Sequence, residues 1–170
     1  MVKIILVQVT DNALGADGYV PGFQTDYTRS MERDNSTEVT KMGSISAIGA
    51  LTETMELSMF AKRNDTGQSE IERAIEEGKE VKLWEVETEK NDAGTNDARF
   101  AFAVVDSHEV SSPAEGLEEI SASFTVQLQS VRGVLEDIPQ SLIDFARYGF
   151  QEPGETTGPH DNFTTTPVGP

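Results

Sequence analysis

Residues 118–130, EEISASFTVQLQS, alternate between apolar and polar side chains along almost their whole length. Because successive side chains of a β-strand point to opposite faces, this pattern predicts a strand with one core face and one polar face. The expected core face consists of Ile120, Ala122, Phe124, Val126 and Leu128. The polar face consists of Glu119, Ser121, Ser123, Thr125, Gln127 and Gln129. It contains no basic residue, so the sequence predicts a polar surface without positive charge.

A second stretch, LTETMELSMF at residues 51–60, repeats this alternation. Its expected core face consists of Leu51, Met55, Leu57 and Met59, with Glu53 as the one mismatch. Its other face consists of Thr52, Thr54, Glu56 and Ser58. The sequence therefore predicts two strands with the same kind of polar face.

The other regular elements indicate a mainly antiparallel β-protein, a sandwich or small barrel with one packed helix. The helix is predicted at residues 69–78, SEIERAIEEG, where Ser69 and Glu72 match a capping box and Gly78 supplies a stop. Further strands are predicted at residues 3–9, 80–89, 98–110 and about 132–138. In residues 98–110, Phe100, Phe102 and Val104 share one face, and residues 139–148 are either a short helix or an irregular return.

Two regions are expected to lie outside the regular elements. Residues 11–50 hold five glycines and many polar residues, which predicts long loops and weak strands in an extension or a mobile loop. Residues 151–170 contain four prolines and no lysine or arginine, which predicts a flexible tail. We therefore expect a β-sandwich domain over residues 1–150, followed by this tail.

The charge balance argues against a partner that is held by its phosphates. The chain of 170 residues has 30 acidic and 13 basic residues, giving a formal net charge of −17. Such a chain has no electrostatic attraction for nucleic acid. Without cysteine it can form neither disulfides nor thiolate metal sites. The apolar run Ile4–Val7 is too short for a signal peptide, so we expect a soluble protein made in the cytoplasm.

The sequence offers no set of residues for catalysis. It lacks the usual phosphate-binding, dinucleotide-binding, nucleophile-elbow and zinc motifs, and its two histidines are His108 and His160. The Asp- and Gly-rich stretches at residues 11–18 and 91–97 lack the spacing of a calcium loop and are better explained as turns. We expect no enzyme, no cofactor and no metal site.

Three segments resemble the major tail proteins of long-tailed, non-contractile bacteriophages, and most closely those from phages of Gram-positive bacteria. They are residues 60–87, FAKRNDTGQSEIERAIEEGKEVKLWEVE, residues 97–139, and residues 148–158, YGFQEPGETTG. The most specific elements are KRNDTGQ before the expected helix, GKEVKLWEVE after it, and PGETTG near the end. The resemblance covers roughly residues 51–158.

This resemblance implies a structural virion protein of the tail tube. Proteins of this kind form hexameric rings, which stack around a tape-measure protein and later conduct the genome into the host. It implies a β-sandwich flanked by a helix, with strands of all six subunits joined into a barrel around the lumen. It also implies tail-terminator and distal tail proteins at the tube ends, with DNA passing through without specific binding and no contact with a membrane.

In such a tube the polar faces would suit the lining of the lumen, because a lining without lysine and arginine gives DNA phosphates nothing to bind. We predict that the lumen is lined by Thr52, Thr54, Glu56, Ser58, Glu119, Ser121, Ser123, Thr125 and Gln127. For contacts between rings we favour residues 11–50, because exposed aromatic side chains suit interfaces. The aromatic residues in question are Tyr19, Phe23 and Tyr27.

Two alternatives stay open at this stage. The first is a tube protein of a contractile injection system, which shares the ring architecture and would be surrounded by a sheath. The second is an acidic β-sandwich adhesion or carbohydrate-binding module, which would need an exposed aromatic platform. Trp84 is the only tryptophan, and its place between Leu83 and Val86 suggests a core position.

Overall fold

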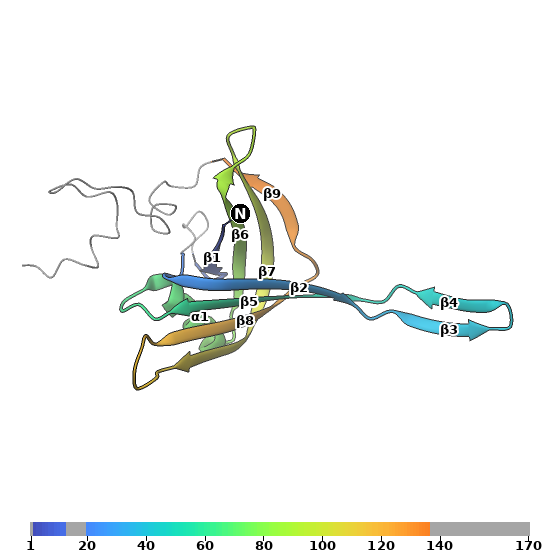
Figure 1. Cartoon of the computed structure of the whole chain (residues 1–170), viewed down its shortest axis with the longest axis horizontal. Helices are drawn as coiled ribbons and strands as arrows, with labels where there is room; N and C mark the ends of the chain where they lie inside the picture. Colours follow the sequence, from blue (N-terminus) through green and yellow to red (C-terminus); the bar gives the residue numbers. More distant parts are fainter. Residues whose placement is uncertain (1, 13–19, 137–170) are drawn as a thin grey trace, which may run out of the picture.

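The computed structural model describes residues 2–12 and 20–136, which form antiparallel strands around a core that one helix closes at one end (Figure 1). The strands are β1 (Lys3–Val9), β2 (Gln24–Arg33), β3 (Ser36–Thr40), β4 (Gly43–Ala47), β5 (Leu51–Phe60), β6 (Glu80–Lys90), β7 (Asn96–Ser111), β8 (Glu119–Val126) and β9 (Val131–Leu135). The helix is α1 (Thr66–Glu77). The mainly β fold with one packed helix is therefore confirmed, while the expected tail at residues 151–170 and the segment 139–148 lie outside the described residues.

One long, bent strand joins the two halves of the sandwich. The main sheet has the order β1-β6-β7-β8-β5-β2, and β9 pairs with β7. The first part of β7 lies between β6 and β9, whereas residues 103–111 pair with β8. One half of the sandwich is thus β1, β6, β9 and the start of β7, and the other is β2, β5, β8 and the end of β7.

The core lies between these halves, where the apolar faces of the strands meet. Both expected core faces are confirmed for most of their residues: Met55, Leu57, Met59, Ile120, Ala122, Phe124 and Val126 are all buried. Leu128 was expected on the same face, but this prediction is wrong, because its side chain is 94% exposed. Strand β8 ends at Val126, and Leu128 has φ of 59°, so the backbone leaves the extended conformation that carries the alternation.

The outer face of the β1–β6–β7 half carries a row of aromatic side chains. Phe100 and Phe102 lie there, whereas the smaller Ala101 and Ala103 enter the core. Trp84 stands beside Phe100 with ring centroids 5.3 Å apart, and it packs on a separate small cluster that includes Ile4, Leu6 and Val86. The expected core position of Trp84 is therefore wrong with respect to the main core, since neighbouring strand positions alternate between the two faces.

Helix α1 begins three residues earlier than its sequence pattern suggested. Asp65 is the N-cap, and its carboxylate accepts the backbone N–H of Gln68 at 2.9 Å. Ser69 instead donates its hydroxyl to the carbonyl of Asp65 at 2.9 Å, so it is not the cap. The Asp65 carboxylate also accepts the N–H of Gly22 at 3.1 Å, and this bond ties the start of the helix to the segment before β2. Gly78 ends the helix in the left-handed conformation, as expected.

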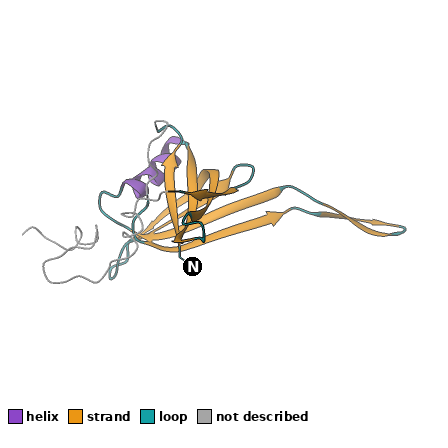
Figure 2. Ribbon diagram, turned by 90° about the horizontal axis from the view of Figure 1, so that it is seen from above, coloured by secondary structure: helices purple, strands orange, loops and turns teal. Residues whose placement is uncertain are grey.

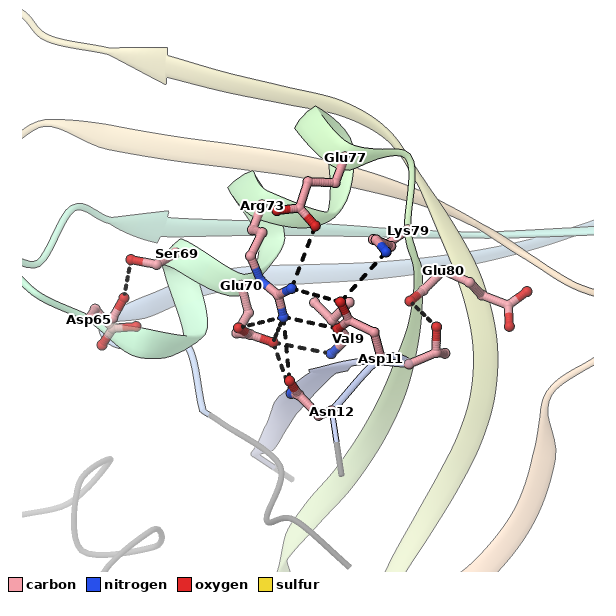
Figure 3. Close-up of polar contacts among 11 residues, drawn as sticks. Val9, Asp11, Asn12, Asp65, Ser69, Glu70, Arg73, Glu77, Lys79 and Glu80 are labelled. Atoms are coloured by element: carbon pink, nitrogen blue, oxygen red, sulfur yellow. Dashed lines mark hydrogen bonds and ion pairs between the residues drawn. The ribbon is translucent and has the colours of Figure 1, made fainter. Parts of the chain in front are cut away.

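A polar network fastens α1 to the end of β1 (Figure 3). Arg73 contacts the carboxylates of Asp11, Glu70 and Glu77 at 2.9 to 3.6 Å. Glu70 also accepts the backbone N–H of Val9 at 3.3 Å. The hydrogen bond from Arg73 lowers the pKa of Asp11, with burial opposing it and the charges of Arg73 and Lys79 assisting. The network fixes the helix across the end of the sandwich where β1 finishes.

Strands β3 and β4 form a hairpin that projects far from the sandwich (Figures 1 and 2). We call residues 36–47 the arm. Its side chains are all exposed, including several apolar ones, with Val39 at 87% and Met42 at 99%. The two backbone segments of the hairpin come very close at its root, where a Cβ on Gly49 would lie 1.4 Å from the carbonyl oxygen of Asp34. The region read as weak strands and loops is therefore a long, defined extension.

Candidate functional site: a polar face without basic residues

The two polar stretches of the sequence lie side by side on one face of the sheet. In the β5–β8 register, Thr54 pairs with Thr125, Glu56 with Ser123 and Ser58 with Ser121. Thr52 and Glu119 continue the same rows at the two ends. Of the residues predicted to line a lumen, Gln127 alone lies just beyond its strand, where its N–H donates to the carbonyl of Phe102 at 2.7 Å.

Two further strands extend this surface on both sides. The β2–β5 register places β2 residues opposite the polar row of β5, and the β7–β8 register places β7 residues opposite that of β8. These additional residues are Asp26, Thr28, Ser30, Glu32, Ser107, Glu109 and Ser111. Asp106 joins them at a bulge, where it accepts a hydrogen bond from Thr125 at 2.6 Å. We call the polar rows of β2, β5, β8 and the end of β7 the polar face.

Sequence reading missed the β2 contribution, although a signal is present. In residues 26–33, DYTRSMER, acidic and small side chains alternate with Tyr27, Arg29, Met31 and Arg33. The second set shares the parity of Met55 and Leu57 and so points to the core side. His108 likewise pairs with the buried Ala122 and not with a polar residue. The polar face thus carries the acids Asp26, Glu32, Glu56, Asp106, Glu109 and Glu119 and no Lys, Arg or His.

Arg29, on the core side of β2, joins two buried carboxylates. Arg29 lies 3.5 Å from Glu53 and 3.1 Å from Glu85, on strands of opposite halves of the sandwich. Glu53, which interrupts the apolar alternation of its strand, is 1% exposed and accepts the Ser130 backbone N–H at 3.0 Å and hydroxyl at 2.6 Å. Its mismatch is therefore explained, because it fixes the turn after β8 to β5.

Glu85 is the second carboxylate, and its charge is stabilised in the folded state. Burial alone would raise its pKa, but hydrogen bonds from Lys3 and Tyr27, with the charges of Lys3 and Arg29, lower the pKa below its ordinary value of 4.5. The hydroxyl of Tyr27 donates to Glu85 at 2.8 Å. Burial, and then this carboxylate, raise the pKa of Tyr27.

Replacing Glu85 by glutamine is expected to lower the free energy of unfolding at neutral pH by roughly 1–3 kcal/mol, since Lys3 and Arg29 lose a buried partner. A lowered folded-state pKa gives stability that is present above pH 4.5 and is lost as the pH falls through the folded-state value. The variant should therefore lose less stability than the wild type between pH 6 and pH 3 in urea titrations. The exposed Glu89→Gln is the control, and equal acid sensitivity in Glu85→Gln would contradict the assignment.

The three aromatic residues expected at contacts between rings occupy different situations. Phe23 is exposed, has φ of 55° and lies with its ring centroid 6.0 Å from the Lys62 ammonium. Tyr27 is half-buried against the core and bound to Glu85, whereas Tyr19 lies outside the described residues. Within the described part of residues 11–50, the most exposed large apolar side chains lie on the arm and not at Phe23 or Tyr27.

The described residues contain no group of His, Asp and Glu side chains suited to hold a metal ion. Within the same ranges, no helix has the length and apolar character needed to cross a bilayer. The surface that stands out is the polar face.

Comparison with known proteins identifies the family. A family model described as phage tail tube protein matches residues 2–132. The chain belongs to the phage tail tube protein family. Its virion tail location, expected from the sequence, is thereby confirmed.

Individual relatives agree with this membership. The chain is 39% identical over 155 residues to the tail tube protein gp17.1* of Bacillus phage SPP1, covering 90% of this chain and 59% of that relative. The chain thus spans about three fifths of the length of that protein. A structure of the SPP1 tail tube matches with a TM-score of 0.72 and 33% identity over 92% of both chains.

A more distant structural neighbour shares the fold alone. The tail of an empty gene transfer agent particle with C6 symmetry matches with a TM-score of 0.58 and 10% identity, covering 75% of this chain and 92% of the other. The 39% sequence identity and the structural similarity to the SPP1 tail tube support the phage tail tube over the two alternatives, the contractile tube and the carbohydrate-binding module.

Proposed function

We propose that this tail tube protein forms hexameric rings that stack into the tube through which the genome enters the host. The polar face lines the lumen in this arrangement. The single observation that carries the proposal is the continuity of this face across four strands, with six acids and no base. An ordinary solvent-exposed sheet face mixes both signs of charge.

The composition of the face suits the passage of a polyanion. A lysine or arginine on the wall would bind a phosphate, and ring symmetry would repeat that contact around every ring. Carboxylates repel the phosphates instead, while serine and threonine hold water against the wall. DNA then passes without adhesive contacts and without specific binding.

Two free strand edges provide the means to close a ring. Among the described strands, β2 pairs with β5 alone, and β7 has no partner besides β8 from Val105 onward. These edges lie at opposite sides of the four-stranded polar face. Pairing β2 of one subunit with the end of β7 of the next would continue the sheet around the lumen and leave no open edge.

The arm provides contacts between successive rings. Its exposed apolar side chains are Val39, Met42 and Ile45, followed by Ile48 at its base. A two-stranded hairpin of this kind does not bury them by itself, and exposed apolar surface of this extent marks an interaction site. We place the tape-measure protein inside the tube and the terminator and distal tail proteins at its two ends, with no reaction and no membrane contact assigned to the chain.

Electron microscopy of the purified full chain at high concentration tests this function. Rings and hollow tubes are the expected result, since both contact surfaces belong to the same chain. A protein that remains monomeric at all concentrations and salt conditions would contradict it.

A further inference from the structure

Three arginines gather in one groove of this acidic protein. A groove of about 580 Å³ between β2 and β9 is lined by Arg29, Met31, Arg99, Gln129, Ser130, Val131 and Arg132, with no acidic residue among them. An adjoining cavity shares the three arginines and adds Lys3, Glu85, Glu87 and Asp97. Basic residues thus outnumber acidic ones here, although the chain has 30 acidic and 13 basic residues.

Two of these arginines occupy paired positions on neighbouring strands. Arg99 of β7 and Arg132 of β9 are directly opposite in the antiparallel register. Like charges in this position destabilise a strand pair. Arg29 is bound to Glu53 and Glu85, and Arg99 donates to the hydroxyl of Ser130 at 2.9 Å. Within residues 2–12 and 20–136, neither Arg99 nor Arg132 has an acidic side chain within 4.0 Å.

We propose that this arginine groove receives the β7–β8 loop of a second copy of the chain, in the adjacent ring. The loop, residues 112–118, is exposed throughout, carries Glu115 and Glu118, and contains no base. Glu119 follows as the exposed first residue of β8. The carboxylates of this loop supply the anionic partners that Arg99 and Arg132 do not have among residues 2–12 and 20–136, because a guanidinium binds a carboxylate through paired N–H donors.

The positions of the two surfaces fit a head-to-tail contact. Figure 1 shows the arm and the β7–β8 loop at opposite ends of the molecule. The groove includes Arg29 and Met31 of β2, the strand that continues toward the arm, and the β8–β9 turn. When rings stack with the arm directed at the next ring, one ring presents its groove to the loops of its neighbour. A contact between two different surfaces of identical chains propagates as an open stack. The inference rests on the proposed ring assembly.

The test uses tube assembly of the full chain, with charge reversal on each side. Arg132→Glu changes an exposed side chain, and Glu115→Lys with Glu118→Lys changes the loop. Each reversal is expected to raise the subunit concentration needed for stacking by roughly a hundredfold, because a weak surface pair is repeated around each ring contact. Combining the reversals should restore stacking. Wild-type tubes should also dissociate as salt rises from 50 mM to 1 M.

The controls separate this inference from the proposed function. Lys90→Glu reverses an exposed base outside the groove and should leave stacking unchanged, and rings of all variants should still form. Stacking of Arg132→Glu at the wild-type concentration would overturn the inference while leaving the tube intact. A combined variant no better than the single ones would overturn the loop as partner. Wild-type chain that forms neither rings nor tubes would overturn the proposed function and this contact with it.

Discussion

Lysine at positions 123 and 125 is expected to slow DNA passage through the tube by about tenfold or more at low ionic strength, while particles still assemble. Ser123 and Thr125 lie on the polar face and outside the core, bound to Ser107 at 2.7 Å and Asp106 at 2.6 Å. Substitution therefore costs two surface hydrogen bonds but creates no cavity. In a hexamer every ring would gain a band of ammonium groups, each able to hold a phosphate.

The measurement is the rate of DNA release from virions after addition of the host receptor, followed with an intercalating dye. The slowing should be greatest at low salt and should fade as salt rises, because phosphate contacts release counter-ions. Glutamine at both positions is the matched control, since it removes the same hydrogen bonds and adds length without charge. Lysine-bearing particles that eject DNA at the rate of the glutamine control at low salt would contradict the lining assignment.

Removal of the arm is expected to abolish tube formation while leaving the sandwich folded. Deleting residues 36–47 takes away no residue of the main sheet, since β3 and β4 pair with each other alone among the described strands. The melting temperature should change by less than about 4 °C, equivalent to about 1 kcal/mol. Apolar contacts between rings would be lost together with Val39, Met42 and Ile45, so electron micrographs should show no tubes.

A point substitution at the arm root provides an independent variant. The variant Gly49→Ala would place a Cβ 1.4 Å from the Asp34 carbonyl oxygen, so the two backbone segments at the root of the hairpin must move apart. The arm would then point elsewhere while its surface stays intact. We expect Gly49→Ala to lose tubes as well. Gly43→Ser at the arm tip strains the backbone locally, because Gly43 has φ of 131°, but it should impair tubes less, since a Cβ there has no neighbour within 4 Å. Normal tubes from the deletion would rule out the arm as the stacking contact.

The strands that the sequence predicted well are those whose alternation is set by burial on one face. Strands β5 and β8 followed directly from residues 51–60 and 118–130, because a slip of one residue would expose Phe124 and Met55. The positions that sequence reading misplaced depend on local backbone geometry. Leu128 continues the apolar alternation in the sequence, but the backbone turns at that residue. Asp65 caps the helix by accepting the Gln68 N–H, and its other carboxylate oxygen accepts the N–H of Gly22.

Only the β5 and β8 rows of the polar face were predicted from the sequence, whereas the β2 and β7 rows were missed. The two outer strands contribute through register with β5 and β8, and pairing partners do not follow from periodicity alone. Strand β2 also contains Arg29 and Arg33, so its sequence does not look like a face without basic residues. The β2–β5 register places both arginines on the opposite side of the strand. The arginine groove could not be seen in advance, since Arg99 and Arg132 meet only through the β7–β9 pairing.

The most direct test of the polar face as the lining is a helical reconstruction of tubes assembled from the full chain, at a resolution that resolves side chains. We expect Thr54, Glu56, Ser123 and Thr125 to border the bore, with β2 of each subunit paired to the end of β7 of the next. A reconstruction in which these residues face outward, or in which arginine and lysine side chains border the bore, would contradict this assignment.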